Sequence, residues 1–357
     1  MFDIQMLPAH HGDSLMVAYG PPDVPRRVLI DCGTAASYPA VRRQILALPE
    51  KQRHFELVVV THVDDDHIGG MLKLLAELDE LGMTVGDIWF NAFPHLEGKT
   101  IASGPDLLGA KQGEALSKLI VEAGLPWNRL FRGRAVVCRD GEPPPEVTLP
   151  GGMKLTLLSP YWAQLEKMRA AWIAECKKAH LLPGGGVEDF AVDDTLGEDV
   201  DALARLPFDP DKAPANGSSI AFIGDYAGTR VLFGADAYAP VLVKSLLAMG
   251  YSADDPYPLA AMKAPHHGSS HNFSRELMEL APSARILIST NGDKFRHPDL
   301  AAVARMVKYN APDATLAFNY ASEFNSFWAK PSRQEKYRYK AVYPETEGEG
   351  LTVQLRE

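Results

Sequence analysis

The nine residues HVDDDHIGG at positions 62–70 constrain this chain more than any other segment. The run ELVVV at 56–60 before them is short, apolar and β-branched, which predicts a buried strand. Apolar residues recur at helical spacing from 70 to 81, which predicts a helix after them. The polar residues therefore occupy the loop between a strand and its helix, where open α/β layers place their sites.

This loop has the residue types and the spacing of a site for two metal ions. Side chains alternate along an extended segment, so His62 and Asp64 can point to one side. The turn into the helix then directs Asp66 and His67 to another side. An acidic helix cap is the alternative, because Asp is common at a helix start. A cap requires one Asp and no flanking histidines, so the pattern favours metal.

The same loop resembles the signature of the metallo-β-lactamase superfamily, His-x-His-x-Asp-His at the end of an early strand, with Asp64 in place of the second histidine. The Asp variant is similar to the branch that contains the hydrolase domain of bacterial competence DNA-uptake channel proteins and the teichoic acid phosphorylcholine esterase. Further segments resemble that branch in the same order. They are GDS at 12–14, VLIDCG at 28–33, NGSS at 216–219, RVLFGADA at 230–237, KAPHHGS at 263–269 and NGDKFRHP at 291–298.

The resemblance implies an α/β fold, a four-layer αββα sandwich with helices outside, and the alternating strand and helix signals predict the same layers. Because the implied ligands run from position 62 to position 297, we expect residues 1–357 to form a single domain, with long insertions at about 95–150 and 160–214. Strands are expected near 2–7, 14–19, 27–31, 56–60, 87–90, 153–158, 218–223, 231–234, 260–264, 285–289 and 351–355. Helices are expected near 39–48, 68–81, 106–123, 161–180, 275–280 and 300–309.

The resemblance also implies which residues hold each ion. His62 and Asp64 would bind the first ion, and Asp236 would bridge both. The second ion would be held by three residues, of which the first is also expected to take part in catalysis: Asp66, His67 and His297.

One ligand of the superfamily pattern is missing. Asn216 and Ser219 stand where ordinary members have a third histidine for the first ion, and the pair His266 and His267 can replace it. We expect His267 to bind metal and His266 to act on the scissile group as an electrostatic stabiliser or proton donor, although the two roles could be reversed. Five residues of the matched segments are expected to support the ligands or contact substrate, the first of them by holding a ligand histidine from behind: Asp31, Asn216, Ser219, Ser269 and Asn291.

The carboxylate content of the site bears on metal and substrate. Zn²⁺ is the default for mixed His and carboxylate ligands, and Asp64 should make the site accept Mn²⁺ more readily. Two ions with a bound hydroxide favour an anionic reacting group, so a phosphodiesterase or nuclease is expected. Two alternatives remain: a catalytically silent binding subunit, since a fold does not fix a function, and a hydrolase of lactones, thioesters or β-lactams.

Composition limits the partners and the compartment. With 46 acidic against 36 basic residues, the chain lacks the basic footprint of a nucleic-acid binder, although a nucleic acid or nucleotide remains possible as the phosphodiester. No apolar run approaches the roughly 18 residues of a membrane span. The first twenty residues show no secretory pattern, and three cysteines without a Cys-x-x-Cys spacing fit reduced thiols. We therefore expect a cytoplasmic protein without a membrane partner; its oligomeric state is not set by these features.

Overall fold

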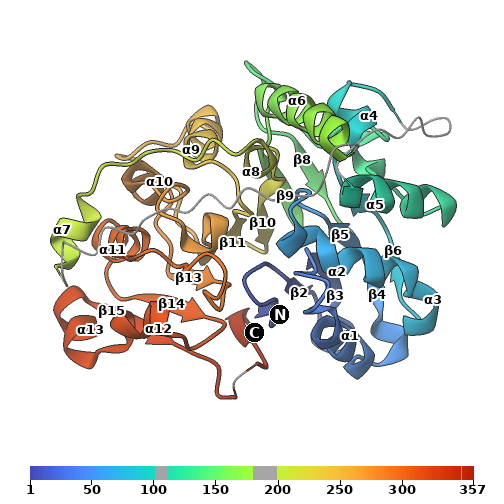
Figure 1. The fold of residues 1–357 in the computed structure, drawn as a ribbon. Helices are drawn as coiled ribbons and strands as arrows, with labels where there is room; N and C mark the ends of the chain where they lie inside the picture. Colours follow the sequence, from blue (N-terminus) through green and yellow to red (C-terminus); the bar gives the residue numbers. More distant parts are fainter. Residues whose placement is uncertain (101–110, 180–198, 347) are drawn as a thin grey trace.

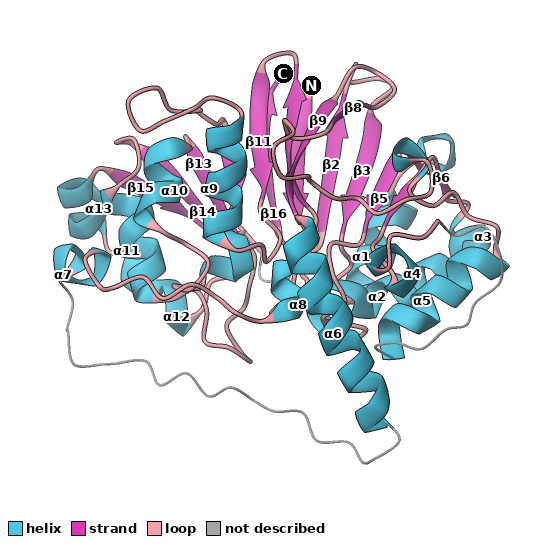
Figure 2. Cartoon of the chain, turned by 90° about the horizontal axis from the view of Figure 1, so that it is seen from above, coloured by secondary structure: helices cyan, strands magenta, loops and turns pink. Residues whose placement is uncertain are grey.

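Two large mixed sheets lie at the centre of the molecule (Figures 1 and 2), of which the structure, a computed structural model, describes residues 1–100, 111–179, 199–346 and 348–357. The six-stranded sheet has the order β16 (Leu351–Arg356), β1 (Phe2–Met6), β2 (Leu15–Tyr19), β3 (Arg26–Ile30), β5 (Leu57–Val59) and β7 (Ile88–Trp89). Its last three strands run parallel. Because β1 also pairs with β16, the two ends of the chain lie side by side (Figure 1).

The eight-stranded sheet is formed by the second half of the chain. Its order is β15 (Tyr339–Val342), β14 (Ala314–Phe318), β13 (Arg285–Ile288), β12 (Ala261–Lys263), β11 (Thr229–Phe233), β10 (Ala221–Tyr226), β9 (Lys154–Ser159) and β8 (Glu146–Thr148). The strands from β11 to β15 are parallel to one another. A separate pair joins β4 (His54–Phe55) to β6 (Thr84–Val85).

Helices cover the outer face of each sheet, and the apolar side chains sort into three buried layers. Alternation along a strand decides the layer: Leu29 and Val58 face the helices of the first sheet, whereas Ile30 faces the second sheet. One layer lies between the sheets, and the other two lie between a sheet and its helices. The predicted four-layer αββα sandwich is therefore confirmed, and Figure 2 shows the strands between two groups of helices.

The helices divide by layer in the order of the sequence. Those packed on the six-stranded sheet include α1 (Tyr38–Ala47), α2 (Asp65–Ala76), α3 (Leu78–Leu81), α5 (Lys111–Glu122) and α6 (Trp162–Ala179). Those packed on the eight-stranded sheet include α7 (Val200–Ala204), α9 (Ala239–Ala248), α10 (Arg275–Leu280) and α11 (Leu300–Lys308). The remaining short helices are α4 (Phe93–Leu96), α8 (Pro214–Gly217), α12 (Glu323–Ser326) and α13 (Pro331–Tyr337). In the described part of the chain, no helix combines the length and the apolar character needed to cross a membrane.

Most expected elements are present within a few residues, and the exceptions have local causes. The strand expected at 218–223 begins only at Ala221, because the preceding residues form α8 with Pro214 at its first position. The helix expected at 68–81 begins at Asp65 and is divided at Glu77 into α2 and α3. Parts of the two helices expected in the insertions, 106–110 and residue 180, lie outside the described residues.

The first expected insertion does not lie wholly outside the sandwich. Within residues 95–150, strand β8 pairs antiparallel with β9 and forms one edge of the eight-stranded sheet. Within residues 160–214, helix α6 packs against the first layer through Leu165, Met168 and Trp172. The described parts of both segments therefore contribute to the layers of the fold.

Candidate metal centre

The candidate site lies where parallel strands of both sheets end. Asp31 follows β3, His62 follows β5 by three residues, Asp236 follows β11, and the pair His266 and His267 follows β12. Carboxyl ends of parallel strands share one edge of a sheet, so two stacked sheets present these residues to a common space.

The backbone at these strand ends is unusual. Asp31, Ala235, His266 and His267 all have positive φ values, of 55°, 46°, 46° and 53°. Non-glycine residues rarely adopt this left-handed region, and such residues cluster at functional sites.

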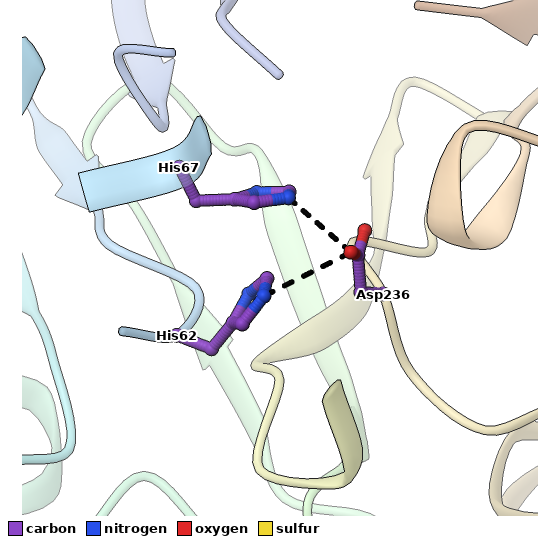
Figure 3. A group of neighbouring side chains, drawn as sticks. All are labelled: His62, His67 and Asp236. Carbon is purple, nitrogen blue, oxygen red and sulfur yellow. Dashed lines mark ion pairs between the residues drawn. The ribbon is translucent and has the colours of Figure 1, made fainter. Parts of the chain in front are cut away.

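Asp236 stands at the centre of the site. Its Oδ2 lies 3.3 Å from His67 Nε2 and 3.8 Å from His62 Nε2, and Figure 3 shows both rings pointing at it. The same oxygen lies 3.7 Å from His266 Nε2, and Oδ1 lies 3.7 Å from His267 Nε2. Four imidazoles from both halves of the chain therefore converge on one buried carboxylate.

Asp31 fixes the rings of His62 and His67 on the side away from Asp236. His67 Nδ1 donates to Asp31 Oδ2 at 2.8 Å. Thr61 donates to the same carboxylate through both its backbone N–H and its hydroxyl, at 2.8 and 2.7 Å. Because that hydroxyl proton is used, Thr61 Oγ1 accepts from His62 Nδ1 at 3.0 Å. When the two rings are neutral, this arrangement keeps the proton on Nδ1 and leaves a lone pair on each Nε2, which faces Asp236.

The backbone carbonyl of Ser289 fixes the ring of His267 in the same way. His267 Nδ1 donates to the carbonyl oxygen of Ser289 at 2.8 Å, so its Nε2 also carries a lone pair. This Nε2 lies 3.5 Å from Asp66 Oδ2. Asp66, His67 and His267, all buried, form one group whose ligand atoms lie within 4.8 Å of one another, and His62, His67 and Asp236 form another.

These inward-facing atoms lack partners. Among the described residues, no hydrogen bond reaches the buried Nε2 atoms of His62, His67 and His267 or Oδ1 of Asp236. Leaving buried polar atoms unpaired is costly, and native proteins pair nearly all of them. Neutral imidazole nitrogens and carboxylate oxygens converging in this way are the donor set that Zn²⁺ and similar divalent ions take. The residues present therefore fit a metal site.

Electrostatics within the site couple the carboxylates to the histidines. Burial lowers the pKa of His67, but the charges of Asp236 and Asp31 outweigh it and raise that pKa well above its ordinary value. Burial raises the pKa of Asp236, but His67, His266 and His267 hold it well below the usual range. The same carboxylates that can bind cations therefore attract protons to the imidazoles.

His266 differs from the other three histidines in its exposure and its partners. Its side chain is 21% exposed, and its Nδ1 donates to Asn272 Oδ1 at 2.9 Å, with Asp211 Oδ2 3.5 Å away. Asn272 is itself held by its Nδ2, which donates to Asp211 and to the Asp236 carbonyl. Burial lowers the pKa of His266, but Asp236 and Asp211 raise it to about 10. Asn272 and Asp211 therefore hold His266 at the more exposed side of the centre, where both carboxylates favour its protonated form.

Two of the expected ligands lie at the margin. The side chain of Asp64 is 45% exposed, and its Oδ2 lies 3.5 Å from His62 Nε2. His297 Nδ1 is 3.0 Å from Asp299 Oδ1, and its ring lies 5.4 Å from that of His266. In the described part of the chain, neither belongs to a group of three possible ligands.

The remaining expected residues have the following places. Asn216 donates to Asp211 Oδ2 at 2.7 Å and so joins the group behind His266. Ser219 is fully buried and its hydroxyl has no partner among the described residues. Ser269 and Asn291 instead bond within their own loops, to the His271 N–H and to Asp293.

Several residues that the sequence interpretation gave no place in the site are central to the structure. Thr61 joins Asp31 to His62, Asn272 and Asp211 hold His266, and Asp13 lies 3.3 Å from His267 Nδ1. Asp13 belongs to one of the matched segments, so a signal existed for it. For Asp211, at the end of the second insertion, we find no such signal.

Comparison with solved structures finds distant similarities. Among solved structures, Zn²⁺-bound PqqB from Methylobacterium extorquens is 12% identical, with a TM-score of 0.42 over 99% of both chains. A diphosphatase from the PhnP family is 10% identical, with a TM-score of 0.41 over 99% of this chain and 97% of that one. A metallo-β-lactamase with a HARLDQ motif from Cronobacter sakazakii is 15% identical, with a TM-score of 0.30 over 69% of this chain and 72% of that one.

Sequence comparison identifies the family. No curated protein gives a significant match to the chain. The model that describes the metallo-β-lactamase superfamily matches residues 26–281, which is more than half of the chain. The chain therefore belongs to the metallo-β-lactamase superfamily, most of whose members are metal-dependent hydrolases.

Proposed function

We propose that this protein is a hydrolase that works with two divalent metal ions, Zn²⁺ or Mn²⁺, and that its substrate is a phosphodiester. The observation that carries the proposal is the convergence of unpartnered Nε2 atoms from His62, His67 and His267 on the carboxylate of Asp236. A catalytically silent scaffold has no need of these three nitrogens and of the unpartnered Asp236 Oδ1, because each atom costs free energy when it is buried and unpaired.

The geometry supports a specific division of ligands. His62, Asp64 and Asp236 would hold one ion. His62 Nε2 lies 3.5 Å from Asp64 Oδ2 and 3.8 Å from Asp236 Oδ2. Asp236 would also contact the other ion, whose further ligands are Asp66, His67 and His267.

This division changes two expectations from the sequence, in which His267 completes the first ion and His297 binds the second. His267 takes the place expected for His297, because its Nε2 lies 3.5 Å from Asp66 Oδ2. His297 then lies beside His266 on the substrate side of the centre.

Bound divalent ions would supply activated water and Lewis acidity to the reaction. The protein's own contribution is to position groups around it. His266, held by Asn272 and Asp211, presents its Nε2–H beside Asp236. From there it can stabilise negative charge on the scissile group or protonate the leaving oxygen.

The charges at the centre favour an anionic substrate. Asp64, Asp66 and Asp236 supply three negative charges against the four positive charges of two divalent ions, which leaves one positive charge (4 − 3 = 1). His266 adds positive character beside it. A phosphodiester has one negative charge and two oxygens that can face both ions, so it matches the centre better than a neutral lactone does. We also propose that the chain belongs to the superfamily branch with the Asp variant of the signature loop, and the carboxylate of Asp64 supports that proposal.

The test is hydrolysis by protein loaded with Zn²⁺ or with Mn²⁺. The substrates are bis-p-nitrophenyl phosphate, linear DNA and RNA, cyclic dinucleotides, a lactone and a β-lactam. We expect cleavage of at least one phosphodiester, abolished in His62→Ala and retained in His54→Ala, whose exposed ring contacts Thr84 outside the centre. Activity on the lactone or β-lactam above that on every phosphodiester would overturn the proposal. No turnover on any substrate with both ions bound would favour a binding subunit instead.

A further inference from the structure

A fully buried lysine lies beside the centre and has no place in the proposed chemistry. Lys263 is the last residue of β12 and has no exposed side-chain surface. Its Nζ lies 2.7 Å from Asp13 Oδ2 and donates to the carbonyl oxygen of Ala264 at 2.9 Å. The free energy lost when two charges are removed from water can exceed the free energy gained from their attraction. Stability alone is therefore a weak reason for such a buried pair.

The other oxygen of Asp13 points at a proposed ligand. Asp13 Oδ1 lies 3.3 Å from His267 Nδ1, on the side of the ring opposite the metal-facing Nε2. Among the described residues this oxygen has no hydrogen-bond partner, because the Nδ1 proton goes to Ser289 O. The carboxylate is therefore a negative charge held behind the imidazole, where carboxylates around metal sites orient histidine ligands and increase their basicity.

The turn that contains Asp13 is hydrogen-bonded to both halves of the centre. The backbone N–H of Asp13 donates to the carbonyl oxygen of Asp66 at 3.2 Å, and the carbonyl of Asp13 accepts from the Gly33 N–H at 2.7 Å. The carbonyl of Gly12 accepts from the Ser289 hydroxyl at 2.9 Å. A Cβ on Gly12 would lie 1.8 Å from the Asp66 carbonyl oxygen, so only glycine permits this approach. The Lys263–Asp13 pair thus has a fixed position relative to the ligands.

We propose that Lys263 and Asp13 are positioning residues of the metal centre: the ammonium keeps a carboxylate behind His267, and the carboxylate holds the imidazole ready to bind metal. The inference rests on the metal centre proposed above. It differs from a purely structural role in one consequence. Removal of both charges together should restore folding stability but not metal affinity.

The experiment compares Asp13→Asn, Lys263→Met and the double variant with wild-type protein. Lys244→Met serves as the control, because Lys244 is half-exposed and pairs with Asp140 away from the site. Zn²⁺ affinity of metal-free protein is measured by competition with a chromophoric chelator, and the Tm of the metal-free protein by thermal unfolding. We expect about 10- to 100-fold weaker Zn²⁺ binding in both single variants, with two ions still bound at saturation. Lys263→Met should also lower the Tm by roughly 5 °C, since it leaves a buried charge unpaired.

The double variant decides between the two roles. We expect its Tm to return toward that of wild type while its Zn²⁺ affinity stays about 10- to 100-fold weaker. Recovery of both Tm and Zn²⁺ affinity in the double variant would overturn this inference and leave the proposed metal centre standing. Unchanged Zn²⁺ affinity in Asp13→Asn, with two ions bound by the wild-type protein, would do the same. Loss of one ion from Asp13→Asn at saturation would also overturn it, because Asp13 would then be a ligand. Wild-type protein that binds no Zn²⁺ would overturn the proposed metal centre as well.

Discussion

Asp31→Asn should weaken metal binding although Asp31 itself faces away from the metal. Its carboxylate accepts from the backbone N–H and hydroxyl of Thr61 and from His67 Nδ1, at 2.8, 2.7 and 2.8 Å. All three partners are donors. An asparagine has one acceptor oxygen and one NH₂ group, so in either orientation its NH₂ meets a donor.

The consequence falls on the histidine tautomers. If the NH₂ of the new asparagine faces His67, the His67 ring can form a hydrogen bond only when Nδ1 accepts. The ring proton then moves to Nε2, which removes the lone pair that would bind metal. The Thr61 hydroxyl must also turn, which disturbs its bond from His62 Nδ1. Loss of such a supporting partner typically weakens metal affinity about 10- to 100-fold, equivalent to about 1.4 to 2.8 kcal/mol. The folded state should lose a further ~1 to 3 kcal/mol through the unpaired buried donor.

The assay is Zn²⁺ affinity by chelator competition together with urea unfolding of the metal-free protein. Asp87→Asn is the matched control. The buried carboxylate of Asp87 also accepts three hydrogen bonds, from the backbone N–H groups of Ile88, Arg129 and Leu130, and an asparagine would likewise turn its NH₂ group toward a donor there. We expect both variants to lose stability and only Asp31→Asn to lose affinity. Equal affinity in wild type and Asp31→Asn would refute the argument that this carboxylate sets the tautomers.

Three further outcomes are expected. His266→Ala should lower turnover roughly 100-fold with metal content intact, whereas His267→Ala should lose an ion; the opposite pattern in metal analysis and kinetics would exchange their roles. Burial lowers the pKa of His95 from 6.5 to about 4, so the unfolded chain binds a proton that the folded chain excludes as pH falls through this range. Urea unfolding should therefore show roughly 3 kcal/mol of stability lost between pH 7 and 4, and much less in His95→Asn, which keeps the acceptor for the local backbone N–H. Gly12→Ala should lower the Tm and weaken Zn²⁺ binding, because its Cβ would meet the Asp66 carbonyl oxygen at 1.8 Å; unchanged values would show that the turn can move aside.

The strand-loop-helix unit at residues 56–81 was predictable because its signals are local. The run ELVVV at 56–60 contains β5 (Leu57–Val59), and apolar spacing places Met71, Leu74 and Leu75 on the buried face of α2. Similar signals existed for α9 (Ala239–Ala248), whose Val241, Leu242 and Leu246 face the core at helical spacing, but the sequence interpretation did not use them.

The arrangement of the site was less predictable, because it depends on contacts between distant segments. Whether His267 or His297 lies near Asp66 is decided by the turn after β12 and the loop after β13, which share no local pattern. The group behind His266 likewise depends on Asp211, which approaches from the end of the second insertion. Residue type and spacing can suggest a set of possible ligands. They do not determine which members meet.

Metal content per chain tests the dinuclear centre most directly. Wild-type protein, loaded and freed of excess Zn²⁺ or Mn²⁺, should retain two ions by elemental analysis. Asp236→Ala should retain markedly less than His297→Ala, because the Asp236 carboxylate faces His62, His67, His266 and His267 whereas His297 lies outside that group. Wild-type protein that retains no ions, or a metal content unchanged by Asp236→Ala, would contradict the proposed centre.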